Sequence, residues 1–305
     1  MTRAAWTLDA PDPALEADVR RRLDEVEDAL GRSARSDVPL VSSTSTYMLG
    51  AGWKRFRPLL VILGGHFGDP HDERLVPGAV AIELTHLATL HHDDVIDEAD
   101  SRRGIPSVNA RWSNTVAILT GDFLFARASE ISSDLGTDVT RLLAITIARV
   151  CEGQIREADA LGRLEVDESS YMEVIRRKTA SLIATSCRLG GMLGDADPRD
   201  VDVLERFGEA LGLAFQLSDD IMDFTADEET LGKEPAVDLR EGVYTLPVIY
   251  ALERSRRRDE LRTLLEQGPP TGERLAGAVR IIRSDGALDL ARDAVTREVR
   301  RAITE

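Results

Sequence analysis

The sequence has few cysteines and no long hydrophobic run, and both absences exclude classes of protein. Two cysteines in 305 residues, Cys151 and Cys187, are too few for a disulfide scaffold, so we interpret them as buried or idle thiols of a reducing compartment. The longest hydrophobic run, residues 59–63, is far shorter than a membrane span. The N-terminal segment lacks the continuous apolar core of a secretory signal. These observations predict a soluble, cytoplasmic protein.

Basic residues are outnumbered, with 38 Lys and Arg against 54 Asp and Glu, which gives a net charge of -16. This charge argues against nucleic acid as a partner, because nucleic-acid binding needs a basic surface. Two local basic groups stand out, Lys54 with Arg55 and Arg57, and the pair Arg102 and Arg103. In an acidic protein such groups are candidates for binding an anionic ligand, and surface ion pairs are the alternative.

Proline is absent between Pro106 and Pro198, and alternating strand patterns are nearly absent, so long helices are expected. Apolar residues recur at three- and four-residue spacing over 12–30 and from 75 to about 100, and again from 203 to 215. We therefore predict an all-α fold. Without a long linker or a repeat, we predict one helical domain over 1–305, with an N-terminal helix inside 1–35. Breaks are expected at residues 69–70, 104–106, 195–198, 232–235 and 268–270.

Two clusters of aspartates carry the strongest chemical signal. Asp93, Asp94 and Asp97 lie in HHDDVIDEADSRRG at residues 91–104, with i, i+1, i+4 spacing. On a helix, Asp93 and Asp97 lie one turn apart on one face, and like charges so placed need a cation to compensate them.

The second cluster repeats that spacing in FQLSDDIMDF, as Asp219, Asp220 and Asp223. Hard oxygen ligands without clustered Cys or His suit magnesium, which bridges protein carboxylates to phosphate. One acidic triplet is more often a solvated surface than a site. Two triplets, each following an apolar helical stretch, predict a polynuclear magnesium site if they face each other across a helical bundle.

A phosphorylated ligand at such a site also needs cationic side chains. Each candidate alone is more often a surface charge than a ligand, and its position beside a motif is what favours binding. The candidates are Lys54, Arg57, Arg102, Arg103, Lys178 and Lys233.

These residues belong to ordered motifs over about 41–252, and there the sequence resembles the trans-type polyprenyl diphosphate synthases, the polyprenyl synthetase family. The motifs are GWKRFRP, HDDVID followed by SRRG, GDFLFARA at 121–128, KT at 178–179, FQLSDDIMD at 215–223, and GKEPAVDLREGVYTLP at 232–247. The resemblance implies a helical bundle of the isoprenoid synthase type with a central cavity. It also implies condensation of isopentenyl diphosphate with an allylic diphosphate, assembly as a homodimer, and Mg²⁺ as the cofactor, with three ions in the substrate complex.

The resemblance also implies roles for individual residues. Asp93, Asp97 and Asp219 would bind the magnesium ions that hold the allylic diphosphate, with Asp94 and Asp223 in support. Neutralisation of that diphosphate would fall to Arg102, Lys178 and Lys233. Isopentenyl diphosphate would be bound by Lys54, Arg57, His86 and Arg103. The dipoles of Thr179 and Gln216 would stabilise the carbocation. His91 and His92 are interpreted as structural. The released diphosphate, rather than a dedicated base, is thought to accept the proton.

The sequence departs from the family pattern at Val243, where a lysine is usual, and at Ala236, where glycine is usual. One phosphate contact is therefore expected to be missing. The C-terminus at Glu305 also looks short, so part of the closing helices is expected to be absent.

Small side chains precede Asp93 on the predicted helix, namely Ala81, Thr85, Ala88 and Thr89. A groove lined by small residues would admit a growing chain, which favours a medium- or long-chain product released with transient membrane contact. Close helix packing is the alternative explanation, and Leu84 or Phe123 would close such a tunnel early. Three other functions remain open: a short-chain synthase, a terpene cyclase on the same fold, and a regulatory subunit of a heteromeric prenyltransferase.

Overall fold

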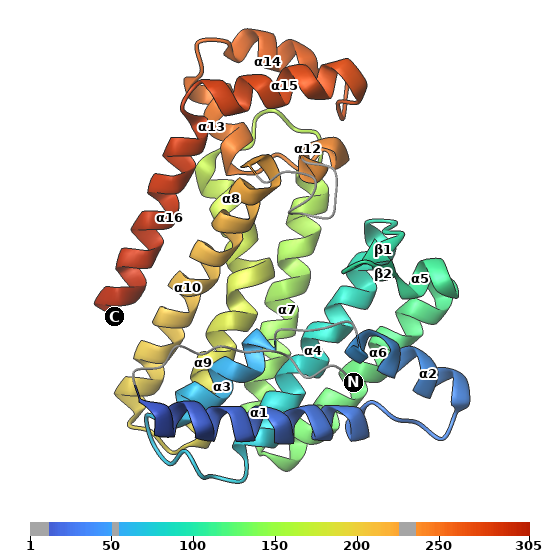
Figure 1. Ribbon diagram of the computed structural model, residues 1–305, viewed down its shortest axis with the longest axis vertical. Helices are drawn as coiled ribbons and strands as arrows, with labels where there is room; N and C mark the ends of the chain where they lie inside the picture. The colour runs from blue at the N-terminus through green and yellow to red at the C-terminus, as the bar shows by residue number, and fades with distance from the viewer. Residues whose placement is uncertain (1–11, 51–54, 226–235) are drawn as a thin grey trace. The chain divides into compact units, whose positions relative to one another are not determined.

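Helices form almost all the regular structure in the residues that the computed structural model describes, which are 12–50, 55–225 and 236–305 (Figure 1). The predicted all-α fold is confirmed. Within these ranges the only sheet is a two-stranded hairpin. None of the described helices has the length and hydropathy needed to cross a membrane.

The described residues divide into two compact units, residues 1–147 with 185–205, and residues 148–184 with 206–305. The three unit boundaries fall inside helices. These helices are α7 (Thr137–Ala160), α9 (Ser181–Leu193) and α10 (Pro198–Thr225). The single domain predicted over 1–305 stays a prediction.

The first unit contains most of the N-terminal helices and the hairpin. Its elements are α1 (Pro13–Ser33), α2 (Pro39–Tyr47), the 3-10 turn η1 (Met48–Gly50), α3 (Phe56–Gly65), α4 (Leu75–Ile96), β1 (Ser101–Arg102), β2 (Ile105–Pro106), α5 (Val108–Arg111) and α6 (Asn114–Asp134).

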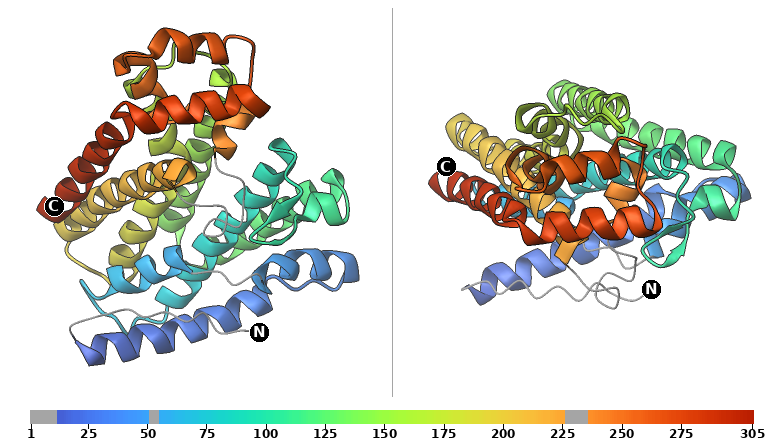
Figure 2. Two further views of the ribbon diagram at one scale, coloured as in Figure 1. Left: turned by 45° about the horizontal axis from the view of Figure 1, so that its top comes forward. Right: turned by 90° about the horizontal axis from the view of Figure 1, so that it is seen from above.

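Helix α1 confirms the amphipathic helix predicted near the N-terminus. Asp12 caps it by accepting a hydrogen bond from the Ala14 N–H, and Pro13 occupies its first turn, where no amide donor is needed. Val19, Val26 and Leu30 are buried. This face packs on α3 and α4, across which α1 runs in both views of Figure 2.

Helix α4 is the centre of the first unit, and it contacts α1, α3 and α6. It is buried over most of its length, so the first aspartate triplet lies at the end of a helix that is held firmly by its neighbours. A Cβ at Gly121 of α6 would lie 3.1 Å from the Ala88 carbonyl oxygen, so glycine permits the close approach of these two helices.

The end of α4 differs from the prediction. The helix ends at Ile96 rather than near residue 100, and β1 and β2 follow, with Ser101 paired to Pro106 and Arg102 to Ile105. The two residues of the loop, Arg103 and Gly104, both have positive φ, 53° and 77°. Two such residues are what a tight hairpin requires. Strands of two residues are too short to show an alternating pattern.

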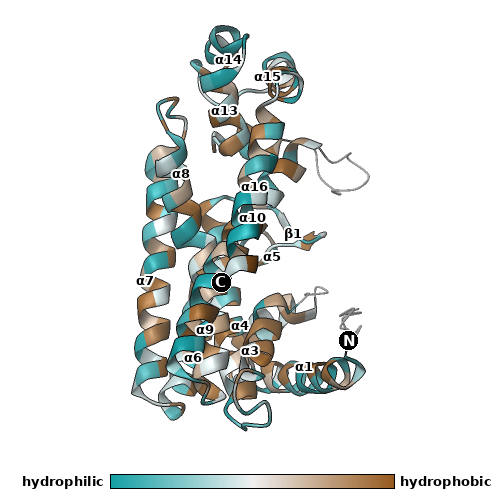
Figure 3. Cartoon of the chain, turned by 90° about the vertical axis from the view of Figure 1, so that its left-hand side faces the viewer, coloured by the Kyte–Doolittle hydropathy of each residue, from teal (hydrophilic) through white to brown (hydrophobic). Residues whose placement is uncertain are grey.

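Helix α7 has one buried face, and Figure 3 shows hydrophobic and hydrophilic stretches alternating along its ribbon. Its buried residues, Val139, Leu143, Thr146, Val150 and Gly153, recur every three or four positions.

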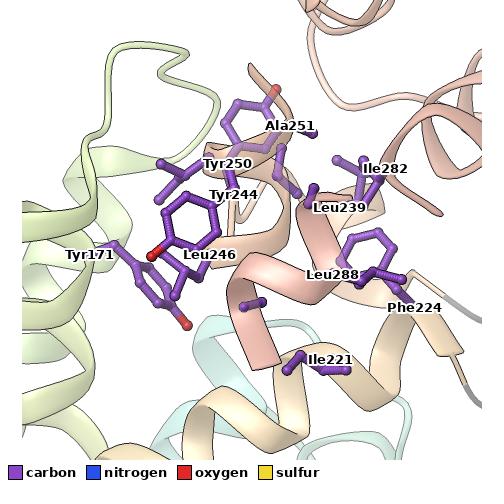
Figure 4. Close-up of a cluster of buried hydrophobic side chains, with 14 of the residues drawn as sticks. Tyr171, Ile221, Phe224, Leu239, Tyr244, Leu246, Tyr250, Ala251, Ile282 and Leu288 are labelled. Atoms are coloured by element: carbon purple, nitrogen blue, oxygen red, sulfur yellow. The ribbon is translucent and has the colours of Figure 1, made fainter. Parts of the chain in front are cut away.

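The second unit has a hydrophobic cluster at its centre. Its further elements are α8 (Glu168–Ile175), the π-helical turn η2 (Arg176–Ala180), α12 (Val237–Glu241), α13 (Leu246–Arg254), α14 (Arg258–Leu265), α15 (Gly272–Ser284) and α16 (Ala287–Thr304). Figure 4 shows Phe224, Leu239, Ile282 and Leu288 converging from α10, α12, α15 and α16. All four are buried, so the cluster fixes the C-terminal end of α10, where the second aspartate triplet lies.

Chain breaks coincide with helix ends at four of the five predicted places. A helix ends before each of residues 69–70, 104–106, 195–198 and 268–270, and the next helix begins after the break or, for α10, at its last residue, Pro198. The fifth, 232–235, lies outside the described residues.

Candidate active site

The first triplet lies at the end of α4, with Asp93 and Asp94 in its last turn and Asp97 as its C-cap. The Asp97 N–H donates to the Asp93 carbonyl oxygen over 2.8 Å, which confirms that the two residues lie one helical turn apart. Asp97 is exposed and Asp93 is half-buried, whereas only 1% of Asp94 is exposed. The first and last carboxylates of the triplet are therefore accessible to a ligand, and the middle one faces inward.

The hairpin supplies the partner of the middle carboxylate. Arg102 Nε donates to Asp94 Oδ1 over 2.7 Å, and its terminal nitrogen lies 2.5 Å from the same oxygen. Arg102 was predicted to neutralise a diphosphate. In the structure it compensates a buried carboxylate and leaves 26% of its side chain exposed.

Three residues predicted to bind isopentenyl diphosphate are electrostatically coupled within the first unit, namely Arg57, His86 and Arg103. Burial lowers the pKa of His86 well below its usual value, and the nearby Arg57 and Arg103 lower it further. The imidazole is therefore neutral at pH 7. Burial also lowers the pKa of Arg57 to about 10, with Glu83 opposing and Arg103 adding to the shift, so Arg57 remains charged.

The neighbouring Arg55 has a structural role. Only 5% of it is exposed, its Nε donates to Glu27 of α1 over 2.6 Å, and a terminal nitrogen donates to Glu83 of α4 over 2.9 Å. These ion pairs join α1 and α4 to the start of α3. Lys54, the remaining residue of this basic group, lies outside the described residues.

The second triplet, near the end of α10, has the same pattern of burial. Asp219 is exposed and Asp223 is half-buried, whereas only 1% of Asp220 is exposed. Asp220 accepts one hydrogen bond from Gln216 Nε2 over 2.9 Å and another from the hydroxyl of Tyr171.

Thr179 and Gln216, both predicted to face a carbocation, contact each other directly. Thr179 Oγ1 donates to Gln216 Oε1 over 2.9 Å. Thr179 lies in the π-helical turn η2, and such turns are rare and frequent at functional sites.

Lys178 precedes Thr179 in that turn and forms an ion pair with Glu157 of α7. A Cβ at Gly153 would lie 2.5 Å from the Lys178 backbone nitrogen, so this close approach of α7 requires glycine. Lys233, the other predicted cation of this group, lies outside the described residues.

Asp223 organises the segment that follows. Its two carboxylate oxygens accept the Val237 and Asp238 N–H groups over 3.1 and 3.3 Å, and its carbonyl oxygen accepts the Ala236 N–H over 2.8 Å. Ala236, where glycine is usual in the family, has a left-handed backbone with φ 61°. Val243, where lysine is usual, is half-buried, and its N–H donates to the Asp238 carbonyl oxygen over 2.8 Å.

The second unit concentrates negative charge. Burial raises the pKa of Asp220 to about 7, against the hydrogen bonds from Tyr171 and Gln216, and Asp219 and Asp223 raise it further. Burial and the carboxylates of Asp223, Asp220, Asp219 and Glu157 raise the pKa of Asp238 well above its usual value. Neighbouring carboxylates repel one another's negative charge and so raise one another's pKa. Such a group favours the binding of a cation, which relieves this repulsion.

The described residues contain no group of three His, Cys, Asp or Glu side chains that could hold a metal. Each triplet instead offers two accessible carboxylates, whose ligand atoms are all oxygen. Magnesium binds in this way, through one or two carboxylates, water and substrate phosphate, so these residues fit magnesium better than a metal with a closed protein cage.

The small residues before Asp93 do not all have the same environment. Ala81, Thr85 and Ala88 are fully buried, and Ala88 lies at the close approach to Gly121, as expected for helix packing. Thr89 is half-buried. It is therefore the member of this set best placed to line a groove.

Sequence reasoning missed four residues of this arrangement, Tyr171, Glu83, Glu157 and Asp238. Glu83 and Asp238 had a weak signal, because Asp238 lies inside the motif at 232–247 and Glu83 lies three residues before His86. Tyr171 and Glu157 lie 49 and 21 residues from their partners, and no local pattern links them.

The chain is similar to known proteins over most of its length. The family model described as polyprenyl synthetase matches residues 38–282. Nonaprenyl diphosphate synthase of Mycobacterium tuberculosis is 39% identical over 97% of this chain and 89% of that protein. Heptaprenyl diphosphate synthase component 2 of Geobacillus stearothermophilus is 42% identical over 87% of this chain and 82% of the relative.

A solved structure gives the same result for the fold. Geranylgeranyl pyrophosphate synthase of Corynebacterium glutamicum, complexed with calcium and isoprenyl diphosphate, aligns with a TM-score of 0.84 and 40% identity over 96% of this chain and 90% of that one.

Proposed function

The chain belongs to the polyprenyl synthetase family and is a prenyltransferase, and from that premise we propose that it joins isopentenyl diphosphate head to tail to an allylic diphosphate. The observation that carries this proposal is the shared pattern of the two triplets. In each, the middle aspartate is buried and held by a partner, and the flanking aspartates remain accessible.

Magnesium is the proposed metal, with three ions in the substrate complex. Asp93, Asp97 and Asp219 would hold it, and Asp223 would assist from its position beside α12. Bound magnesium supplies positive charge next to the departing diphosphate, which lowers the cost of carbon–oxygen cleavage. The calcium named for the Corynebacterium structure is also a hard divalent cation and supports this choice.

The basic residues divide between two diphosphates. Arg57, His86 and Arg103 would bind isopentenyl diphosphate, together with Lys54. Lys178 and Arg102 would neutralise the allylic diphosphate, together with Lys233. Lys178 pairs with Glu157 and Arg102 with Asp94, so a carboxylate orients each of these two cations.

The reaction needs little acid–base chemistry from the protein. The allylic carbon–oxygen bond breaks, and the double bond of isopentenyl diphosphate attacks the carbocation before water does. Thr179 and Gln216 would turn the oxygen ends of their dipoles towards that cation. The released diphosphate would accept the proton that the adduct loses.

The product is proposed to be of medium or long chain length. The nonaprenyl and heptaprenyl synthases among the relatives support this proposal, and the half-buried Thr89 is consistent with it. The geranylgeranyl synthase is equally similar in sequence, so a short-chain product is the alternative.

An assay with labelled isopentenyl diphosphate tests the function. The purified protein, with magnesium, is incubated with each allylic primer from dimethylallyl to geranylgeranyl diphosphate, and the dephosphorylated products are separated by length. We expect elongated linear products, abolished by a chelator and restored by magnesium. Cyclic hydrocarbon formed without isopentenyl diphosphate would identify a cyclase. Inactivity until another subunit is added would identify one part of a heteromeric enzyme, as the name of the Geobacillus relative suggests for that protein.

We also propose a cytoplasmic homodimer. Ile118 and Leu119, 43% and 60% exposed, form an apolar face on α6 that a second copy would cover. The exposed thiol of Cys151 suits a reducing compartment. Light scattering after gel filtration gives the mass, and a monomer would contradict the dimer. Transient contact with a membrane for product release remains part of the proposal, and vesicle flotation with and without product tests it.

A further inference from the structure

Tyr171 connects the hydrophobic cluster of the second unit to the aspartate triplet of α10. Only 6% of it is exposed, and Figure 4 shows its ring at one edge of that cluster, beside Leu246. Its hydroxyl donates to Asp220 Oδ2, 49 residues away in the sequence. A phenol that is packed by its ring and bonded by its oxygen holds one orientation.

The two oxygens of Asp220 have separate donors. Oδ2 accepts from Tyr171, and Oδ1 accepts from Gln216 Nε2 over 2.9 Å. Gln216 Oε1 in turn accepts from Thr179 Oγ1 over 2.9 Å. These four side chains form one continuous path of hydrogen bonds from α8 through α10 to η2.

This path determines which end of the Gln216 amide is available for the reaction. Because Nε2 donates to Asp220, the amide oxygen points the other way, towards Thr179. The oxygen has two lone pairs and Thr179 uses one. An amide turned by 180° would present its NH₂ group, which repels a positive charge. Asp220 therefore orients Gln216 only while Asp220 itself cannot rotate.

We propose that Tyr171 is a positioning residue for the prenyl transfer, because its hydroxyl fixes Asp220 and thereby keeps the Gln216 amide oxygen directed at the allylic cation. This inference rests on the proposed function. In this role Tyr171 acts through Asp220 and Gln216 and not by contact with the substrate. It belongs to none of the motifs by which the family was recognised.

The arrangement differs from that of the first triplet. There the buried Asp94 is held by Arg102, a cation whose side chain is partly exposed. Asp220 is held by a neutral phenol and a neutral amide, so this carboxyl group is oriented without a counter-cation. A fixed, preorganised dipole is more effective near a developing cation than one that must reorient.

Tyr171→Phe tests the proposal, since it removes one oxygen and keeps the ring. The matched control is Tyr244→Phe. Tyr244 is 5% exposed in the same hydrophobic cluster, and its hydroxyl has no hydrogen-bond partner among the described residues. Both variants are assayed as full-length protein with saturating magnesium, about 20 °C below their unfolding midpoints.

Loss of one oriented hydrogen bond to a carboxylate should lower kcat of Tyr171→Phe about tenfold. We expect the KM for isopentenyl diphosphate to stay within twofold of the wild-type value, and Tyr244→Phe to behave as wild type. A structural role alone would lower thermal stability and leave kcat per folded molecule unchanged, and that result would overturn the proposal.

A double-mutant cycle with Gln216→Leu gives a second measurement. If Tyr171 acts through Gln216, Tyr171→Phe should change kcat by less than twofold once the amide is gone. A further tenfold loss in that background would show that the two residues act independently, which contradicts the proposal. Absence of condensation by the wild-type protein would instead refute the proposed function, so the two failures are distinguishable.

Discussion

Arg102 and Asp94 form an ion pair between the hairpin and the last turn of α4, with nitrogen and oxygen 2.5 Å apart. The two residues are eight positions apart; α4 ends at Ile96, Glu98 has a left-handed backbone with φ 49°, and β1 then brings Arg102 to Asp94. Adjacent arginines consequently have different surroundings. Arg102 points to the buried carboxylate, and Arg103 is exposed.

Arg102→Leu should destabilise the protein by about 2 kcal/mol, because Asp94 would remain buried without its counter-charge. The figure is below that for a fully buried pair because a quarter of the Arg102 side chain is exposed to solvent. Urea unfolding measures it. The control is Arg103→Gln, for which we expect unchanged stability and a raised KM for isopentenyl diphosphate. Equal stability losses in both variants would contradict the assigned division of roles.

Ala236→Gly should stabilise the protein by about 0.5–1 kcal/mol, because an alanine at φ 61° has a steric cost that glycine avoids. Thermal unfolding is the measurement. The reciprocal change, Gly242→Ala, should destabilise, since Gly242 has φ 83° and an added Cβ would lie 3.1 Å from Pro269 Cγ. No gain in Ala236→Gly would mean that the buried methyl group offsets the strain.

Asp93→Ala and Asp219→Ala should each reduce turnover by about 100-fold or more, because each removes a carboxylate proposed to bind metal. Their folds should be retained, since Asp219 is exposed and Asp93 is half-buried. Steady-state kinetics and circular dichroism measure the two effects. Asp259→Ala, at a residue whose side chain is 97% exposed on α14, serves as the control and should keep full activity. Near-normal turnover in either triplet variant would exclude that residue from the mechanism.

The free energy of unfolding should decrease as the pH is lowered, and part of this decrease should come from protonation of His91. Only 1% of His91 is exposed, its Nε2 has no hydrogen-bond partner among the described residues, and burial lowers its pKa to about 4. Below the ordinary pKa of 6.5, His91 binds a proton in the unfolded chain but stays neutral in the folded protein until the pH approaches 4. Stability is therefore present above pH 6.5 and lost as the pH falls towards 4, by up to about 3 kcal/mol.

His91→Gln cannot titrate, so the difference in unfolding free energy between wild type and variant should change over that interval. Urea unfolding at several pH values with the metal removed gives this difference. A constant difference from pH 4 to 7 would show that His91 is protonated equally in both states.

Thr89→Phe should shorten the product if the groove beside α4 holds the growing chain, because a ring one turn before Asp93 would block it. Chromatography of the dephosphorylated products measures the length. Thr89→Val, of similar volume, should leave the product unchanged. An identical product from Thr89→Phe, with normal stability, would place the chain elsewhere.

Periodicity was sufficient to predict α1, α4 and α10 and the position of both triplets, because long amphipathic helices carry their own signal in the spacing of residues such as Val19, Val26 and Leu30. The hairpin was not predictable in this way. Its strands have two residues each, and its turn depends on the left-handed backbone of Arg103, a conformation that arginine rarely adopts.

The sequence also could not show which aspartate of each triplet is buried. Aspartates at positions i, i+1 and i+4 look alike until a partner is known, and the partners come from elsewhere, Arg102 from the hairpin and Tyr171 from α8. Burial therefore separates residues that a motif presents as equivalent.

The π-helical turn at Arg176–Ala180 makes this segment sensitive to its length. Deleting one residue there would allow an ordinary α-helical turn to form, and it would rotate α8 by about 100° relative to the residues that follow. Tyr171 would swing away from Asp220 although no residue of the hydrogen-bonded path had been replaced. The number of residues between the phenol and Thr179 is therefore constrained by geometry, whichever side chains stand at positions 176 and 177.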